Sequence, residues 1–232
     1  MKKIGKIILV VLCVFVAASI FYVCDYSHNT DDSATKSTNT VKVSQTDFGY
    51  FYDGPGNEDA MIFYPGGKVE DLSYSSLLKE IAANGMDCFL VNMPMNLAVF
   101  GSDKAQEVLD DYSYQHWYMG GHSLGGSMAA KFVAENEDDF KGLVLLAAYS
   151  TYDLSDTDLT VLTIYGSNDK VLNRSRLKKY KSNLPKDSET YVIEGGNHSG
   201  FGTYGKQSGD GKRSISYMEQ IAIASSIIDD LE

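Results

Sequence analysis

The sequence predicts one α/β domain built on a mostly parallel sheet with helices on both faces. From Asp47 onward, short apolar runs alternate with amphipathic ones, which is typical of strands joined by right-handed helical crossovers. The apolar runs are nearly continuous, as expected of strands buried on both faces. No internal repeat and no second zone of composition interrupts the pattern, so residues 47–232 are predicted to form a single domain.

Each expected strand is a short apolar run that ends at turn-forming residues or at a helix. Residues 47–52 (DFGYFY) alternate as a half-exposed strand does, and residues 60–64 stop at Pro65-Gly66-Gly67. The other expected strands cover residues 86–92, 116–119, 143–148, 159–165 and 190–194.

The expected helices lie between these strands. Residues 72–84 carry Leu77, Leu78 and Ile81 at helical spacing, and Gly85 follows as a stop. The other expected helices cover residues 103–111, 127–135, 176–182 and 214–231. In such folds the functional residues lie on loops at the carboxyl ends of the strands, so the chemistry should follow these strands directly.

The first thirty residues differ from the rest of the chain. Lys2, Lys3 and Lys6 precede residues 7–23, an apolar run of seventeen residues without a charge. As a helix at about 1.5 Å per residue the run would span about 26 Å, close to the thickness of the hydrocarbon layer. This pattern predicts a signal-anchor, a transmembrane segment over residues 1–26, with the lysines in the cytoplasm.

Two alternatives to the anchor exist. A cleaved signal peptide would use the small residues Ala17-Ala18-Ser19, but the chain stays apolar well beyond them. A lipoprotein signal at Cys24 would need a small residue before it, where Val23 stands. We therefore expect a single-pass protein of the cell membrane with residues 47–232 extracellular, or a secreted one if the signal is cleaved.

Residues 27–46 are rich in Ser, Thr, Asn and Asp and are predicted to form a polar linker. Cys88 is the one cysteine outside the first 26 residues, so no disulfide framework is expected. Without the three lysines that precede the apolar run, 17 basic residues face 31 acidic ones, a net charge of −14. This charge argues against nucleic acid or an anionic bilayer surface as a partner, and leaves the N-terminal segment as the membrane contact.

Three expected strands are followed by residues that can carry chemistry. Ser123 lies in GGHSLGG (120–126), where glycines two positions before and after it allow a tight strand-to-helix turn. Asp169 follows the strand at 159–165 and His198 follows the one at 190–194. Taken singly, each has a plainer interpretation: an incidental serine in a glycine-rich turn, a solvated turn aspartate and a surface histidine.

The three residues together favour a catalytic triad. Of the other histidines, His28 lies in the linker, His116 begins a strand and His122 lies within the turn, which leaves His198 as the base. Nucleophile, acid and base then follow in the order Ser123, Asp169, His198, each directly after an expected strand.

These segments resemble the α/β-hydrolase superfamily, near its compact, dienelactone-hydrolase-like branch of bacterial serine esterases. The resemblance covers the chain from about Asp59 to its end and rests on YPGGKVE (64–70), GGHSLGGSMAA (120–130), LTIYGSNDKV (162–171) and GGNHSGFGTYG (195–205). It implies an oxyanion hole made by the amide of Leu124 and one from the loop after an early strand. That second donor corresponds to Gly67, with Lys68 as an alternative, and Pro65-Gly66 stands where many relatives have His-Gly.

The resemblance implies acyl transfer as the reaction. His198 would take the proton of Ser123, Asp169 would fix the imidazole tautomer, and Leu124 with Gly67 would bind the oxyanion. No Cys, His or carboxylate spacing suggests a metal, and no glycine cluster matches a phosphate-binding pattern, so neither a cofactor nor a nucleotide is expected.

The expected substrate is a small or extended acyl ester. Only residues 149–158 lie where relatives of this fold insert a helical lid, so no sizeable lid is expected. Residues 93–100 (MPMNLAVF) form either an apolar wall of the site or a core loop, and residues 201–211 either shape the leaving-group side or lead into the last helix. Two other functions stay open: a transferase or deacylase acting on cell-envelope polymers, and a non-catalytic binding module on a surface.

Overall fold

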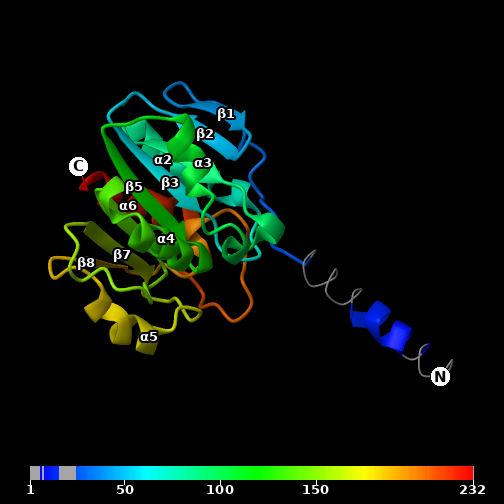
Figure 1. Ribbon diagram of the computed structural model, residues 1–232. Helices are drawn as coiled ribbons and strands as arrows, with labels where there is room; N and C mark the ends of the chain where they lie inside the picture. The colour runs from blue at the N-terminus through cyan, green and yellow to red at the C-terminus, as the bar shows by residue number, and fades with distance from the viewer. Residues whose placement is uncertain (1–5, 7, 16–24, 232) are drawn as a thin grey trace.

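An eight-stranded sheet runs through the described part of the chain, which comprises residues 6, 8–15 and 25–231 of the computed structural model (Figure 1). The strands lie in the order β1-β2-β4-β3-β5-β6-β7-β8. β2 pairs with β1 and β4 antiparallel, and the pairings from β4 to β8 are parallel, which confirms the expected mostly parallel sheet. The strands are β1 Lys42–Thr46, β2 Gly49–Asp53, β3 Asp59–Tyr64, β4 Asp87–Val91, β5 His116–His122, β6 Gly142–Leu146, β7 Thr160–Gly166 and β8 Glu189–Ile193.

Helices cover both faces of the sheet, as the sequence predicts. Leu77 of α2 and Ile221 of α6 belong to one apolar cluster with Met61 of β3. Val133 of α4 belongs to a second cluster with Ile62, the next residue of β3. Because neighbouring residues of a strand point to opposite faces, the two clusters lie on opposite sides of the sheet. The helices are α2 Ser75–Asn84, α3 Ala105–Asp111, α4 Leu124–Glu135, α5 Arg174–Lys179 and α6 Tyr217–Asp229.

Short 3₁₀ turns connect several of these elements. They are η1 Asp71–Tyr74, η2 Pro94–Asn96, η3 Ala98–Phe100, η4 Glu137–Asp139, η5 Tyr180–Asn183 and η6 Ser199–Phe201. Residues 147–159, between β6 and β7, contain no helix, which confirms the absence of a sizeable lid at that position.

The strand before Ser123 is longer than its apolar residues suggest. It extends beyond Met119 because Gly121 and His122 pair with β6. Helix α4 begins at Leu124, so a single residue, Ser123, separates strand from helix. The parallel register brings the carboxyl ends of β3, β5 and β6 to the same edge of the sheet.

The structure corrects the expected linker at residues 27–46, which is bound to the domain along its length. Lys42–Thr46 form strand β1, paired with β2. Val41 and Ala34 are buried, and the amide of Thr30 donates to the carbonyl oxygen of Thr203 at 2.8 Å. The polar composition misled because several of these polar groups, such as those of Asn29, Thr30 and Asp31, bond to the domain.

Most of the expected membrane segment lies outside the described residues, namely residues 1–5, 7 and 16–24. Residues 8–15 are described and helical, and their large apolar side chains are 56–69 % exposed. Among the helices that the structure describes, none has the length and apolar character needed to cross a bilayer. The signal-anchor over residues 1–26 stays a prediction.

Candidate active site

The turn around Ser123 has the strained geometry that its glycines predict. Ser123 has φ 52° and ψ −118°, a backbone conformation that a residue with a side chain rarely adopts. A Cβ on Gly125 would come within 2.3 Å of the carbonyl oxygens of Tyr64 and Pro65. A Cβ on Gly121 would meet the backbone of Gly125 at 2.7 Å. Both glycines therefore let β3 and the start of α4 pack closely beneath Ser123.

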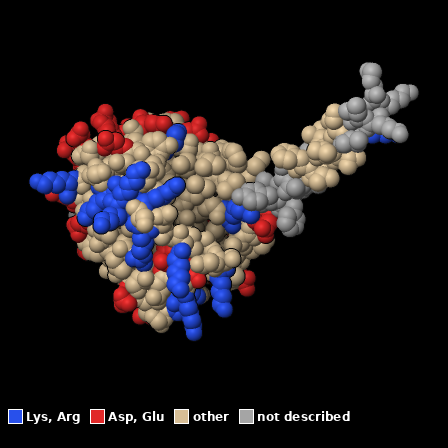
Figure 2. All heavy atoms as spheres, turned by 90° about the horizontal axis from the view of Figure 1, so that it is seen from below, with Lys and Arg blue, Asp and Glu red and all other residues tan. Residues whose placement is uncertain are grey.

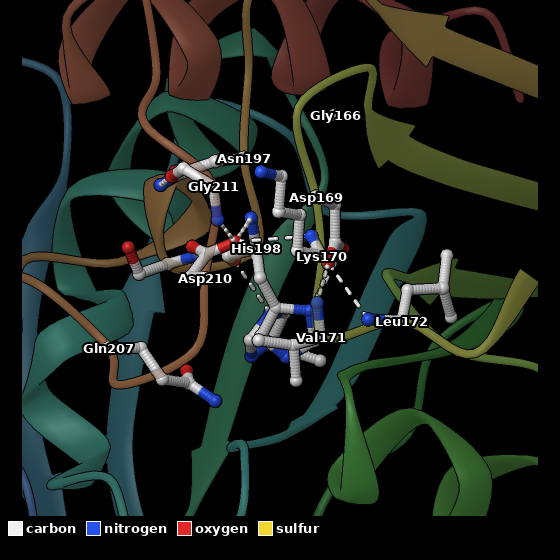
Figure 3. Close-up of polar contacts among 12 residues, drawn as sticks. Gly166, Asp169, Lys170, Val171, Leu172, Asn197, His198, Gln207, Asp210 and Gly211 are labelled. Carbon is white, nitrogen blue, oxygen red and sulfur yellow. Dashed lines mark hydrogen bonds and ion pairs between the residues drawn. The ribbon is translucent and has the colours of Figure 1, made fainter.

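Asp169 and His198, the expected acid and base, form a buried hydrogen-bonded pair (Figure 3). Oδ2 of Asp169 lies 2.9 Å from Nδ1 of His198, and Oδ1 accepts the amides of Val171 and Leu172 at 2.8 Å each. Burial alone would raise the pKa of the Asp169 carboxyl. The hydrogen bond and charge of His198 and the two amides outweigh burial and lower this pKa below its ordinary value.

This pairing fixes the tautomer of the neutral His198 imidazole. An ionised carboxylate can only accept, so Nδ1 carries the proton and Nε2 carries the lone pair. Nε2 of His198 is buried and has no hydrogen-bond partner among the described residues. Ser123 is joined to His198 by no hydrogen bond in the described chain, a geometry that often tightens only when substrate is bound.

His122, the residue before Ser123, connects the strand end to the histidine loop. Its ring lies 4.6 Å from the ring of His198, centroid to centroid. Nε2 of His122 lies 3.1 Å from the carbonyl oxygen of His198, which can only accept, so this nitrogen is the donor. Burial, together with the charge of His198, lowers the pKa of His122 well below 6.5, so its Nδ1 is an unprotonated acceptor.

A directed chain of hydrogen bonds follows from this assignment. Tyr74 Oη, 2.9 Å from Nδ1 of His122, donates its proton there, and the Tyr74 oxygen accepts the amide of Gly66 at 3.1 Å. Burial raises the pKa of Tyr74, which keeps the phenol protonated. Gly66 is thereby linked through two buried side chains to the backbone of His198. Sequence reasoning gave neither Tyr74 nor His122 such a role.

Of the two candidate oxyanion donors on the β3 loop, Gly67 has the free amide. The amide of Lys68 donates to the carbonyl oxygen of Asn96 at 2.7 Å, whereas the amide of Gly67 donates to no described residue. A Cβ on Gly67 would lie 2.8 Å from Cδ2 of Leu124, so the two residues are neighbours. Leu124 is the first residue of α4, where amides have no partner within the helix. Gly67 and Leu124 stay the predicted pair.

Asp210 is a site residue that the sequence did not predict, because it lies between two glycines in no recognisable catalytic motif. Its carboxylate accepts the amides of His198 and Ser199 at 3.3 and 3.0 Å, and that of Lys170 at 3.4 Å (Figure 3). It also accepts the amide of Gly211 at 2.7 Å. Asp210 therefore joins the loop that carries Asp169 to the loop that carries His198.

Gln220 of α6 is a second residue that sequence reasoning missed. It is fully buried, and its side chain accepts the amide of Asn197 at 3.0 Å and donates to the carbonyl of Asn197 at 2.8 Å. A Cβ on Gly200 would lie 2.0 Å from the Gln220 oxygen, so the loop packs tightly against α6. A lone amide on the apolar face of an amphipathic helix was the available signal.

Basic residues are concentrated in the part of the sequence around His198, although the chain as a whole is acidic. Ten of the 20 Lys and Arg residues lie between residues 170 and 213. Figure 2 shows Lys and Arg gathered over part of one face. A cleft of about 450 Å³ beside Asn197 and Ser199 is lined by residues of the 205–213 segment, including Lys206, Lys212 and Arg213. Ser123, Leu124 and Gly67 do not line this cleft, so it lies to one side of the candidate nucleophile.

The loop at residues 93–100 is packed into the core at some positions and exposed at others, and its role as a wall of the site stays a prediction. Met93 and Ala98 are buried in the core, while Met95, Val99 and Phe100 are 55, 47 and 60 % exposed. Among the described residues, no cluster of three or more His, Cys, Asp or Glu side chains could hold a metal ion.

Comparison with known proteins identifies the family and finds solved structures with a similar fold. The model of the alpha/beta hydrolase family matches residues 60–222. No curated protein sequence matches the chain. The fold is similar to that of a predicted CIB-like hydrolase from Thermoplasma acidophilum, with TM-score 0.63, 12 % identity and coverage of 82 % of this chain and 99 % of that one.

Two esterases share the fold. Est1E from Butyrivibrio proteoclasticus has TM-score 0.59, 13 % identity and coverage of 83 % of this chain and 99 % of its own. Carboxyl esterase 2 from the mycorrhizal fungus Tuber melanosporum has TM-score 0.60, 12 % identity and coverage of 89 and 91 %. At these identities the likeness shows the fold alone, and the dienelactone-hydrolase-like branch stays a prediction. The family model spans most of the chain, so the chain belongs to the alpha/beta hydrolase family.

Proposed function

We propose that the protein is a serine hydrolase that cleaves a carboxylic ester through Ser123, His198 and Asp169. The observation that carries the proposal is the state of His198. Its Nδ1 is bonded to a buried carboxylate, and its Nε2 is unpartnered, on a loop that touches the residue before Ser123. A buried imidazole with one nitrogen oriented and the other unused is what a general base requires.

In the acylation step, Ser123 Oγ forms a bond to the carbonyl carbon of the ester while its proton passes to Nε2 of His198. The charge that develops on the carbonyl oxygen is stabilised by the amides of Leu124 and Gly67, at roughly 3–4 kcal/mol each. The carbon–oxygen bond to the alcohol then breaks, and the alcohol leaves with the proton from His198. The product is an ester of the acyl group with Ser123.

Deacylation repeats the step with water. Nε2 of His198 takes a proton from water, the hydroxide oxygen bonds to the acyl carbon, and the bond to Ser123 Oγ breaks. The proton on His198 returns to Ser123, and the carboxylic acid is released. Asp169 stays ionised throughout and stabilises the imidazolium that forms twice in the cycle.

The lack of a helical insertion between β6 and β7 leaves the site open. This favours small or extended acyl groups over substrates that need a closed pocket. For location, we propose an extracellular domain anchored in the cell membrane, from the lysines, the apolar run at residues 7–23 and the exposure of its described part. The experiment that bears on location is protease protection of the full chain in intact cells.

The test of the chemistry is to treat the full chain and its Ser123→Ala variant with a fluorophosphonate probe and with short p-nitrophenyl esters. We expect the wild type to be labelled and to turn over, and the variant to do neither. A wild type that is neither labelled nor active would overturn the enzyme proposal and favour a binding module. Labelling without hydrolysis would indicate transfer of the acyl group to an acceptor other than water.

A further inference from the structure

Three of the exposed large apolar side chains of the domain lie together on one loop. We call residues 94–100 the apolar loop; it comprises η2 and η3 and exposes Met95, Val99 and Phe100 by 55, 47 and 60 %. Met95 has φ 57°, a left-handed conformation that side chains other than glycine rarely adopt. The backbone of the loop is therefore strained at Met95. A group of exposed apolar side chains such as this one often marks a surface that binds a protein or a membrane.

The apolar loop borders the candidate oxyanion site. The amide of Lys68 donates to the carbonyl oxygen of Asn96 at 2.7 Å. Cδ2 of Leu97 lies 3.5 Å from the position that a Cβ on Gly67 would take. Any surface that covers Val99 and Phe100 thus also lies near the entrance to the site.

The chain that follows the expected anchor is bound to the same place. We call residues 25–34 the stem, which Figure 1 shows running along the domain on its way to β1. Ser27 pairs with Val69 as a parallel bridge, donating to the carbonyl of Lys68 and accepting the amide of Glu70, both at 2.8 Å. Nζ of Lys68 lies 3.4 Å from the carboxylate of Asp25.

The stem then crosses to the histidine side of the site. Thr30 donates its amide to Thr203, and the hydroxyl of Thr203 donates to the side chain of Asn29 at 2.6 Å. Thr203 lies five positions after His198 on the same loop. The stem therefore contacts both the loop that carries Gly67 and the loop that carries His198.

Few residues of the chain separate the stem from the apolar run. Residues 7–23 end two positions before Asp25, and two residues span at most about 7 Å. The same Lys68 contacts Asp25 through its side chain and Asn96 through its amide. Asp25, which follows the apolar run in the sequence, and the apolar loop thus lie on one side of the domain.

We infer that the apolar loop is seated in the interface of a lipid bilayer, so that the candidate active site opens toward the membrane. The domain is acidic overall, so charge would not draw it to an anionic surface, whereas exposed Val99 and Phe100 can enter the acyl-chain boundary. The substrate would then be an ester whose acyl chain lies in that bilayer. The nature of this substrate rests on the proposed hydrolase function, whereas the position of the apolar loop in the bilayer does not.

The test of the seating measures position and not activity. The full chain, with Cys13→Ser and Cys24→Ser and with buried Cys88 retained, would carry an environment-sensitive fluorophore at Phe100→Cys. Met218→Cys on α6 is the control, since Met218 is 44 % exposed and belongs to neither the apolar loop nor the stem. Both chains are reconstituted in phosphatidylcholine vesicles and exposed to brominated lipid or to iodide in the water.

We expect brominated lipid to quench the label at position 100 and iodide to spare it, with the reverse at position 218. A label at position 100 that iodide quenches and lipid spares would overturn the inference. A label shielded from both quenchers would also overturn it, since a second copy of the chain would then cover the loop.

The substrate clause is tested with a Val99→Ser/Phe100→Ser variant and a matched Met218→Ser/Ile223→Ser control. We expect the loop variant to lose about tenfold or more of its turnover of a vesicle-embedded ester, from the apolar burial it gives up, and to keep its turnover of a soluble ester. Equal losses on both esters would overturn the clause. If the wild type hydrolyses neither ester, the proposed function fails, while the fluorescence result still decides the seating.

Discussion

His122 donates from Nε2 to the carbonyl oxygen of His198 at 3.1 Å, so the residue before the candidate nucleophile holds the backbone of the candidate base. Because this donor role and the bond from Tyr74 to Nδ1 need one proton on the ring, the contact requires a neutral His122. Burial keeps it neutral by lowering its pKa well below 6.5, and a positive charge on His198 lowers this pKa further.

The lowered pKa of His122 predicts acid-sensitive stability. Below about pH 6.5 the unfolded chain binds a proton at His122 that the folded chain does not. The free energy of unfolding should therefore fall as the pH falls, by up to about 1.4 kcal/mol per pH unit from this group. The contribution is complete above about pH 6.5 and is lost toward the lower folded pKa. Urea denaturation of the wild type and of His122→Asn measures it, and equal slopes in the two chains would contradict the assignment.

The backbone strain at Ser123 predicts that two inactive variants differ in stability. Ser123→Ala and Ser123→Gly both remove the hydroxyl, but glycine adopts φ 52° without a Cβ clash. We expect Ser123→Gly to be the more stable variant by about 1 kcal/mol, the lower end of the strain such residues store. Urea unfolding at constant m-value checks this. A glycine variant less stable than the alanine variant would show that the turn is not strained.

Asp169→Asn should abolish most activity while the protein stays folded. The amide would no longer favour the tautomer with a proton on Nδ1 of His198, and in a comparable triad this costs about 10⁴-fold in kcat. Since the pKa of Asp169 is lowered, its ionic stabilisation is present above about pH 3.8 and is lost as the pH falls through the folded pKa. Asp153→Asn, at an exposed aspartate, is the control, and p-nitrophenyl ester kinetics with circular dichroism are the measurements. Unchanged kcat in Asp169→Asn would remove Asp169 from the site.

Asp210 should matter through the loops that it joins. Asp210→Ala leaves the amides of His198 and Ser199 without their acceptor, so we expect kcat to fall and hydrogen exchange at both amides to rise. Asp210→Asn keeps one acceptor oxygen and should retain more of both properties. Mass-spectrometric exchange on the two variants separates this role from a general loss of stability. Equal exchange in the alanine variant and the wild type would contradict it.

Much of the fold could be predicted because the apolar runs have strand and helix periods and follow one another in a simple order. The positions of Ser123, Asp169 and His198 after β5, β7 and β8 follow from that order, since parallel strands end at one edge. The Asp169–His198 contact agrees with that expectation.

The missed features depend on contacts between distant segments. β1 has few apolar residues and is identified only by its pairing with β2. Asp210 and Gln220 act on backbone amides, so no motif of their own marks them. The direction of the hydrogen bonds of His122 follows from burial and partners, and neither is visible in the pentapeptide around Ser123.

The contacts of the stem also limit how far the domain can move from its anchor. A free linker of about twenty residues would let a domain sample a radius of roughly 25 Å above its anchor. With Ser27 paired to Val69 and the following residues bound to the domain, that radius shrinks to the two residues before Asp25. If residues 7–23 anchor the chain, the domain diffuses in two dimensions with its bilayer, and polymers farther out in the envelope lie beyond its reach.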